Sequence, residues 1–306
     1  MSGIYTDLAM ELRELNPEIQ GISEQNEQDG EIAIKRIGIF TANAAAKVGK
    51  AMGNYVSLDS DALSDRPREA FDAVSNRLAQ ELRGLIRLDV PKSSFLIVGL
   101  GNRNVTPDSL GPKTIEKIII TRHVKQHLPE VFKSDLASVS AIAPGVLGIT
   151  GVETMEIIKG VAERTDPDCI IVIDSLASRR AARINSTIQL SDAGISPGSG
   201  VGNRRADISS RTLGVPVIAI GVPLVVHAST IARDIISIIA KESGQGEDEK
   251  VIETLTQGAA EKHLDNMIVT PKNIDQIVQD MSGMIANAIN KAIFGDELEN
   301  LKDLLM

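Results

Sequence analysis

The sequence predicts an α/β fold: a mainly parallel sheet with helices on both faces and an antiparallel arm. Short apolar runs alternate with segments of helical periodicity from residue 94 to residue 241, and such alternation gives right-handed βαβ crossovers and a parallel sheet. The segment 182–192 follows a strand directly, so we expect it to pair antiparallel or to form a hairpin arm. With 306 residues, 42% hydrophobic and 24% charged, the chain has the composition of a soluble globular protein of one large or two small domains.

The N-terminal third begins with a strongly acidic segment that is poor in core-forming residues. It is typical of an exposed arm or of a short helix that docks on another part of the structure. Apolar and polar residues alternate over 31–40, which predicts a strand, and Phe71, Val74 and Leu78 are spaced as on one face of a helix. The predicted elements of this third are strands at 31–40 and 55–59, a short helix within 41–53 and a helix at 65–86.

The remaining two thirds carry the alternation of strands and helices. Buried strands are predicted at 94–99, 138–143, 169–174 and 216–222, and helices at 112–128, 154–165, 230–241 and 273–293. In the last helix one stripe of Ile and Met residues faces the core, where methionine fills gaps. The segment 244–250 has the composition of a surface loop.

Composition excludes several kinds of protein. The chain has no Trp, two Tyr and five Phe, which argues against stacking surfaces for single-stranded nucleic acid. A net charge of −9 argues against tight binding to a phosphate backbone. The single cysteine, Cys169, excludes disulfides and cysteine-based zinc sites and is interpreted as a buried thiol rather than a nucleophile. The longest apolar stretch, 215–226, is too short to span a membrane, and the N-terminus does not read as a signal peptide.

Ligands of open α/β sheets gather at the carboxyl ends of the strands. Asp108 lies in the Gly- and Pro-rich loop 99–112, and Asp174 ends the most apolar strand of the chain. Each has a structural alternative: Asp108 as a helix cap, and Asp174 as a cap or as the partner of Arg179. If the two strands are neighbours, the carboxylates come close enough to share a proton, so that one acts as base and the other as acid. Such a pair activates water for attack on an amide carbonyl.

Other motifs are weaker. The loop 99–112 lacks the third glycine of a dinucleotide-binding turn, and 197–205 lacks the Lys of a phosphate-binding loop. Serines near residue 175 are not set in a nucleophile elbow, and the spacing of His123 and His127 lacks the Glu of a zinc-protease helix. Neither a serine triad nor a histidine-based metal site is therefore expected.

Four blocks, in order along the chain, give the sequence a resemblance. They are GLGNRNVTPDSLGP (99–112), APGVLGITGVET (143–154), IDSLASR (173–179) and TIQLSDAGISPGSGVGNRR (187–205). Together with TDLAME near the start and GVPLVV at 221–226, they strongly resemble the germination proteases of spore-forming bacteria.

The resemblance implies a fold like that of hydrogenase maturation proteases (phosphorylase/hydrolase-like), a homotetramer and no cofactor or metal. It implies an aspartic-type endopeptidase, located in the forespore or spore core, that degrades small acid-soluble proteins and binds neither DNA nor membranes itself. The catalytic aspartates of the family match Asp108 and Asp174. Cleavage is expected after an acidic residue that precedes a large apolar residue and Ala.

The family is made as a zymogen, and Thr6-Asp7-Leu8-Ala9 resembles its self-processing site. Cleavage between Asp7 and Leu8 would divide the chain into a propeptide, 1–7, and a single peptidase domain, 8–306. Binding of the substrate's acid calls for a cation, for which Arg103, Arg179 and Arg204 are candidates by position; surface ion pairing is the alternative for each.

One block departs from the family, because GVPLVVHA carries Leu224 and His227 where a Thr and an acid are expected. His227 either alters the pH optimum or is a structural histidine. Two other functions stay open. One is a metal-dependent peptidase that uses Asp108, Asp174 and His227, and the other is a non-catalytic spore protein that binds a partner.

Overall fold

The computed structural model describes residues 6–65, 68–127, 136–202, 205–242, 264 and 267–305. Its strands are β1 (Ile22–Asp29), β2 (Ile32–Ile39), β3 (Gly53–Asp59), β4 (Ser94–Gly99), β5 (Ser138–Ile142), β6 (Cys169–Ser178), β7 (Thr187–Ser191), β8 (Val217–His227) and β9 (Ile268–Val269). In this part of the chain they form one sheet in the order β1-β2-β3-β7-β8-β6-β4-β5, with β9 on β8. The α/β class is therefore confirmed.

Four neighbouring strands, β8, β6, β4 and β5, run parallel. The three inner strands β8, β6 and β4 are mostly apolar and buried, as strands covered on both faces must be, whereas the edge strand β5 carries two serines and is only partly buried. In the register of β6, Ile173 lies opposite Gly99 of β4, and Asp174 lies opposite Gly221 of β8. Asp174 therefore lies just beyond the carboxyl end of β4. The prediction that it ends its own strand is wrong, because β6 continues to Ser178 by pairing with β8.

The rest of the sheet is antiparallel. The predicted arm is confirmed, since β7 pairs antiparallel with both β8 and β3. Strands β2 and β1 extend the sheet further in the same manner. The sequence pattern did not reveal β1, because its side chains are exposed and polar and leave no apolar alternation.

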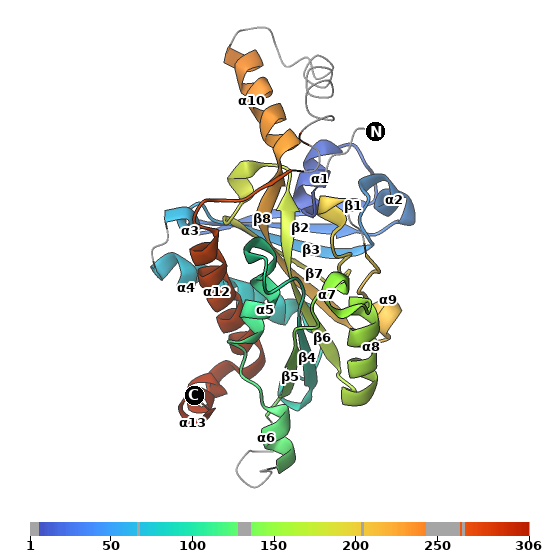
Figure 1. Ribbon diagram of the computed structural model, residues 1–306, viewed down its shortest axis with the longest axis vertical. Helices are drawn as coiled ribbons and strands as arrows, with labels where there is room; N and C mark the ends of the chain where they lie inside the picture. Colours follow the sequence, from blue (N-terminus) through green and yellow to red (C-terminus); the bar gives the residue numbers. More distant parts are fainter. Residues whose placement is uncertain are drawn as a thin grey trace.

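Side chains that alternate along β4 enter two different cores. Phe95 and Ile97 pack with the helices α4 (Arg68–Leu85) and α12 (Ile274–Phe294), whereas Leu96 and Val98 pack with Ile158 of α8 (Thr154–Thr165). Figure 1 shows these helices on opposite sides of the sheet. Helices thus cover both faces, as predicted. Cys169 belongs to the first core, and burial raises the pKa of its thiol to about 12.

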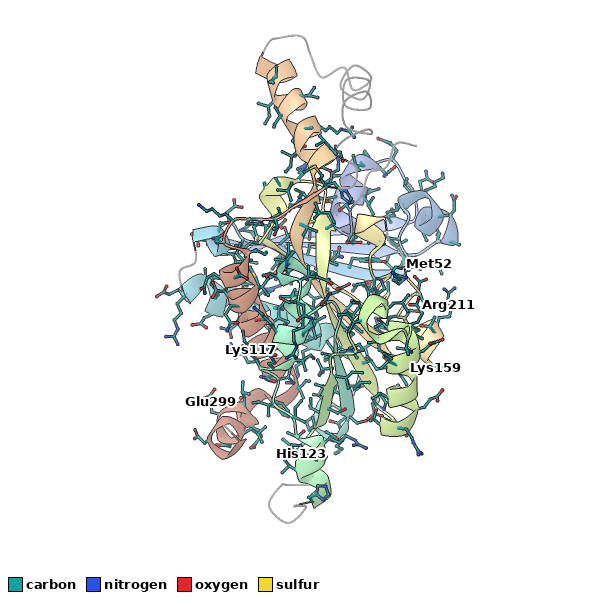
Figure 2. All side chains as sticks on the ribbon, in the orientation of Figure 1. Met52, Lys117, His123, Lys159, Arg211 and Glu299 are labelled. Carbon is teal, nitrogen blue, oxygen red and sulfur yellow. The ribbon has the colours of Figure 1, made fainter. Side chains whose placement is uncertain are left out.

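Each predicted helix has a counterpart in the structure, but the segment 112–128 differs from its prediction. It contains two short helices, α5 (Leu110–Ile115) and α6 (Arg122–His127), rather than one. Lys117, between them, donates from Nζ to the carbonyl oxygen of Gln279 and to Oγ of Ser282, and Figure 2 shows it beside α12. The remaining helices include α1 (Ala9–Leu15), α2 (Ala42–Val48), α3 (Ala62–Asp65), α7 (Leu147–Thr150), α9 (Ser210–Leu213), α10 (Ala228–Glu242) and α13 (Leu298–Leu305).

The acidic N-terminal segment is docked. Leu8, Ala9 and Met10 are buried in a third core that includes Ile37 and Ile39 of β2. The prediction of a short helix that packs on another part of the structure is confirmed by α1. Among the described residues no helix has the length and apolarity needed to cross a membrane. The predicted loop at 244–250 lies outside the described residues.

Candidate functional site

Asp174 is one of the buried charged groups in the sheet, with 6% of its surface exposed. It follows five buried residues of β6, and its Oδ1 accepts a hydrogen bond from the backbone N–H of Ser175 at 2.9 Å. Burial raises the pKa of this carboxyl well above its ordinary value, and the charges of Asp108 and Asp7 raise it further. The carboxyl groups of Asp108 and Asp7 therefore interact electrostatically with that of Asp174.

Asp108 lies in a 3-10 helix, η2 (Thr106–Asp108), of the loop that follows β4. Its Oδ2 accepts a hydrogen bond from the backbone N–H of Asn102 at 2.8 Å, so the carboxylate closes its own loop rather than capping α5. Gly101 makes this possible: its φ is +106°, and a Cβ there would lie 2.0 Å from the carbonyl oxygen of Asp108. Burial raises the pKa of Asp108 as well.

The two aspartates are brought together by the parallel pairing of β4 and β6. Each pKa is raised, by burial first, and the charge of Asp108 adds to the shift of Asp174. Because the charge of one disfavours ionisation of the other, two carboxyl groups in this relation do not easily ionise together. They can act as one base and one acid on a bound water.

The N-terminal segment enters this neighbourhood at Asp7. The backbone N–H of Asp7 donates to the carbonyl oxygen of Ala177 at 2.9 Å, and the N–H of Ala177 donates to Oδ2 of Asp7 at 2.9 Å. Ala177 lies three residues beyond Asp174 on β6. Asp7 is thus bound along the end of the strand that carries Asp174.

A second element encloses the carboxylate of Asp7. Ser199, in the 3-10 helix η4 (Ser199–Val201), donates from Oγ to Oδ1 at 2.6 Å. A Cβ on Gly200 would lie 2.0 Å from Oδ2, so the absence of a side chain there allows the close approach. Nε2 of His227 is hydrogen-bonded to the carbonyl oxygen of Gly200 at 3.0 Å. Asp7, 9% exposed, lies in a pocket built from β6 and η4.

The peptide bond that follows Asp7 is also held. Nζ of Lys50 donates to the carbonyl oxygen of Asp7 at 2.7 Å, and Nε2 of Gln189 donates to the same oxygen at 3.1 Å. The backbone N–H of Leu8 donates to Oγ1 of Thr6 at 3.1 Å. Leu8 itself is fully buried.

Glu11 fixes the helix that follows. It is 1% exposed and accepts hydrogen bonds from the backbone N–H groups of Arg179 and Arg180 at 2.7 and 3.0 Å. These two residues follow the end of β6 directly. The start of α1 is therefore attached to the same strand that carries Asp174 and binds Asp7.

The three arginines proposed to bind substrate have different positions. Arg103 is 60% exposed and forms an ion pair with Glu116 at 2.9 Å. The side chain of Arg179 is partly buried, which lowers its pKa, and the charges of Arg233 and Arg180 lower it further. Arg204 lies outside the described residues. In the described part of the chain, the groups that hydrogen-bond to the Asp7 carboxylate are the Ala177 N–H and the Ser199 hydroxyl.

Residues of a metal-dependent alternative are not assembled. Within the described ranges, no three His, Cys, Asp or Glu side chains form a group that could hold a metal ion. His227 is buried and contacts Gly200. His123 lies on α6, and the figures show this helix at the opposite end of the molecule from α1 (Figures 1 and 2).

The sequence did not reveal Lys50 or Gln189 as part of this site. Lys50 follows the C-terminal glycine of a short helix, and Gln189 is one of the polar residues that alternate with apolar ones in the fully buried strand β7. The one available signal was Gln189, because a buried amide needs hydrogen-bond partners. No motif or periodicity around Lys50 indicated a role in the site.

The family model and the relatives found by sequence similarity indicate the same family. A family model described as germination protease matches residues 4–264. A germination protease of Caldanaerobacter subterraneus is 46% identical over 95% of this chain and 94% of its own length. Those of Clostridium tetani and Bacillus subtilis are 40% and 39% identical over 99% and 95% of this chain. Among solved structures, a NiFe hydrogenase maturation protease from Thermococcus kodakarensis aligns with 68% of this chain and 97% of its own, at 14% identity and a TM-score of 0.34.

Proposed function

This chain belongs to the germination protease family, a family of peptidases, and from that premise we propose that it is the endopeptidase that degrades small acid-soluble spore proteins during germination. One observation carries the proposal: Asp7, which precedes the bond expected to be cut, is hydrogen-bonded to Ala177 on the strand that carries Asp174, and its charge contributes to the raised pKa of Asp174. A peptide segment held in this manner is what a peptidase site requires of its substrate.

The proposed mechanism uses Asp108 and Asp174 as a pair that shares one proton. The ionised carboxylate removes a proton from water, whose oxygen attacks the carbonyl carbon of the scissile amide. The protonated carboxyl then gives its proton to the departing nitrogen, and the C–N bond breaks. The raised pKa of both groups supports this division, because a carboxyl must remain protonated to act as an acid.

The proposed specificity is an acidic residue, then a large apolar residue, then Ala. In the docked segment these positions are Asp7, Leu8 and Ala9. The carboxylate of Asp7 is hydrogen-bonded by Ser199 and Ala177, whereas Leu8 and Ala9 are 0% and 1% exposed. Among the described residues, the groups that hydrogen-bond to this carboxylate are uncharged.

The same contacts support a zymogen. We propose that residues 1–7 are a propeptide, that residues 8–306 are the peptidase domain, and that cleavage after Asp7 converts one form to the other. While Asp7 lies against Ala177 and Ser199, another acidic residue cannot occupy that pocket. The uncut segment therefore blocks the site by occupying it.

A homotetramer in the forespore or spore core completes the proposal. Figure 1 shows α10 projecting from the rest of the fold. On it Ile235, Ile238 and Ile239 are 51%, 56% and 59% exposed. Contiguous exposed apolar side chains commonly mark a protein interface, so α10 is the part of the described chain that best supports contact with a second copy.

The deciding experiment is incubation of the protein with a purified small acid-soluble spore protein, followed by mass spectrometry of the fragments. We expect cuts after acidic residues that precede a large apolar residue and Ala. Cleavage of an unrelated unfolded protein at other residues, with the spore protein left intact, would overturn the substrate assignment.

Two alternatives are separated by further measurements. A metal-dependent peptidase using Asp108, Asp174 and His227 would lose activity after chelation and regain it with a divalent ion. A non-catalytic binding protein would retain the spore protein on a column without cutting it. Full activity in chelator excludes the first, and any cleavage excludes the second.

A further inference from the structure

The carbonyl oxygen of Asp7 has two side-chain donors. Lys50 supplies a cation at 2.7 Å from this oxygen, and Gln189 supplies an amide N–H at 3.1 Å. During hydrolysis after Asp7, this same oxygen becomes negatively charged as water adds to the carbonyl carbon. Both donors lie at hydrogen-bond distance from the atom on which charge develops.

Gln189 holds the backbone on both sides of the bond. Its Nε2 donates to the Asp7 carbonyl oxygen, and its Oε1 accepts from the N–H of Ala9 at 2.7 Å. The side chain is 7% exposed and projects from β7, a strand fixed between β3 and β8. A rigid, buried amide in this position keeps its orientation while the carbonyl carbon changes geometry.

Lys50 is brought to the site by the end of α2. Gly49 ends this helix with a φ of +74°, and the N–H groups of Gly49 and Lys50 both bond to the carbonyl oxygen of Ala45. This turn directs the Lys50 side chain toward the N-terminal segment. The carboxylate of Asp7 belongs to the residue whose carbonyl is attacked, so a cation at this oxygen offsets nearby negative charge that would oppose an oxyanion.

We propose that Lys50 and Gln189 are the oxyanion hole of this peptidase, donating to the carbonyl oxygen of the acidic residue at the cleaved bond. In this mechanism the pair Asp108 and Asp174 takes a proton from water and gives one to the leaving nitrogen. The negative charge that develops on the carbonyl oxygen is stabilised by Lys50 and Gln189. The proposal rests on the proposed function, since it requires cleavage after Asp7.

The test follows self-processing of the full chain in a single turnover, by N-terminal sequencing and mass, in Lys50→Met, Lys50→Arg and Gln189→Glu. The glutamate keeps an oxygen that can accept from Ala9 and removes the donor. Loss of one oxyanion donor lowers a rate by about 10²–10³-fold, which we expect for Lys50→Met and Gln189→Glu. Lys50→Arg, which retains a cation and donors, should recover part of the rate. Lys47→Met and Gln80→Glu are controls at exposed positions and should process at the wild-type rate.

Hydrogen exchange of the Asp7 and Ala9 amides separates chemistry from docking. An oxyanion hole predicts slow processing while the Asp7 amide stays protected, since it bonds to Ala177. Slow processing together with lost protection of both amides means that the two side chains only hold the segment in place and overturns the proposal, as does an unchanged rate. A wild-type chain that never cuts itself, even at acidic pH, and leaves a spore protein intact overturns the proposed function itself.

Discussion

Oγ of Ser199 donates a hydrogen bond of 2.6 Å to the carboxylate of Asp7, across a separation of 192 residues. The neighbouring Gly200 lies so close to the same carboxylate that a Cβ would overlap Oδ2. One short 3-10 helix therefore recognises an acid by a hydroxyl group and by the absence of a side chain. His227 contacts the same glycine from β8, which places this histidine behind the pocket.

Substitutions in this pocket should weaken the preference for an acid. Hydrogen bonds to a charged group are worth about 1.5–3 kcal/mol, so Ser199→Ala should lower kcat/KM for an acid-containing peptide by about 10-fold or more. Gly200→Ala should lower kcat/KM for this peptide further, because the new methyl group displaces the carboxylate. The measurement is kcat/KM for matched peptides with Asp or Asn before the cleaved bond, and the ratio should fall in both variants.

The matched control is Gly160→Ala, at a helical position where a Cβ meets nothing within 4 Å. It should leave both peptides unaffected. An unchanged Asp-to-Asn ratio in Gly200→Ala would mean that the acid of a separate substrate binds elsewhere, with Arg103, Arg179 or Arg204 as the candidates predicted from the sequence.

Periodicity predicted most of the fold, and its failures have physical reasons. Strands β4, β6 and β8 are so apolar that their own sequences predict them, and the apolar stripe of α12 predicts that helix in the same way. Strand β1 is exposed and polar, so it is held by pairing with β2 rather than by burial. The segment 112–128 is divided because Thr121 binds strand β5 through the N–H of Val139, an interaction that periodicity does not reveal.

The site was partly predictable for similar reasons. Asp108 follows β4, and Asp174 lies in β6 just beyond the last residue that pairs with β4, so the apolar runs before them indicate their position in the sheet. Lys50, Gln189 and Ser199 meet the Asp7 residue from three separate parts of the chain, and only the packing brings them together. Contacts between distant residues that share no pattern cannot be derived from one sequence.

Replacement of Asp7 should preserve the uncut chain. In Asp7→Ala the hydrogen bonds from Ser199 and Ala177 to the carboxylate are lost, and with them the recognition of the acid. N-terminal sequencing after acidification should find Leu8 as the first residue in the wild type and no new terminus in the variant. Asp72→Ala, at an exposed helix position, is the control and should be cut normally. A new Leu8 terminus in Asp7→Ala at the wild-type rate would refute this role.

Conversion of either aspartate of the pair to Asn should abolish cleavage without unfolding the protein. The amide keeps the size of the carboxyl group and an oxygen that can accept from Ser175 or Asn102, but it cannot take up or release the proton of the reaction. Cleavage of a spore protein by Asp108→Asn and Asp174→Asn should fall by at least about 10²-fold, the lower range for general acid–base catalysis. Circular dichroism should show an intact fold, and retained cleavage by either variant would remove that residue from the mechanism.

Charge placed on α10 should disrupt assembly. Ile235 and Ile239 are four residues apart, on one face of the helix, and both are more than half exposed. Ile235→Glu combined with Ile239→Glu should reduce the mass measured by light scattering from that of a tetramer to that of a smaller species. Met52→Glu changes an exposed apolar residue that lies away from α10 in Figure 2 and should leave the mass unchanged. A double variant with the wild-type mass would place the subunit contacts elsewhere.

The raised pKa of Asp174 predicts that this residue destabilises the folded protein at neutral pH. A carboxyl with a higher pKa in the folded than in the unfolded state binds its proton more tightly when folded. The free energy of unfolding therefore falls as pH rises from the unfolded pKa, about 3.9, through the folded pKa.

Asp174→Asn cannot ionise, so its free energy of unfolding does not fall in this way. Its Tm should exceed that of the wild type at pH 8, and the difference should vanish near pH 4, where both side chains are neutral. Asp303→Asn, at an exposed position on α13, should show no such pH-dependent gain. If Asp174→Asn were no more stable than the wild type at pH 8, burial would not be holding the proton on this carboxyl, and the acid of the proposed pair would have to be Asp108.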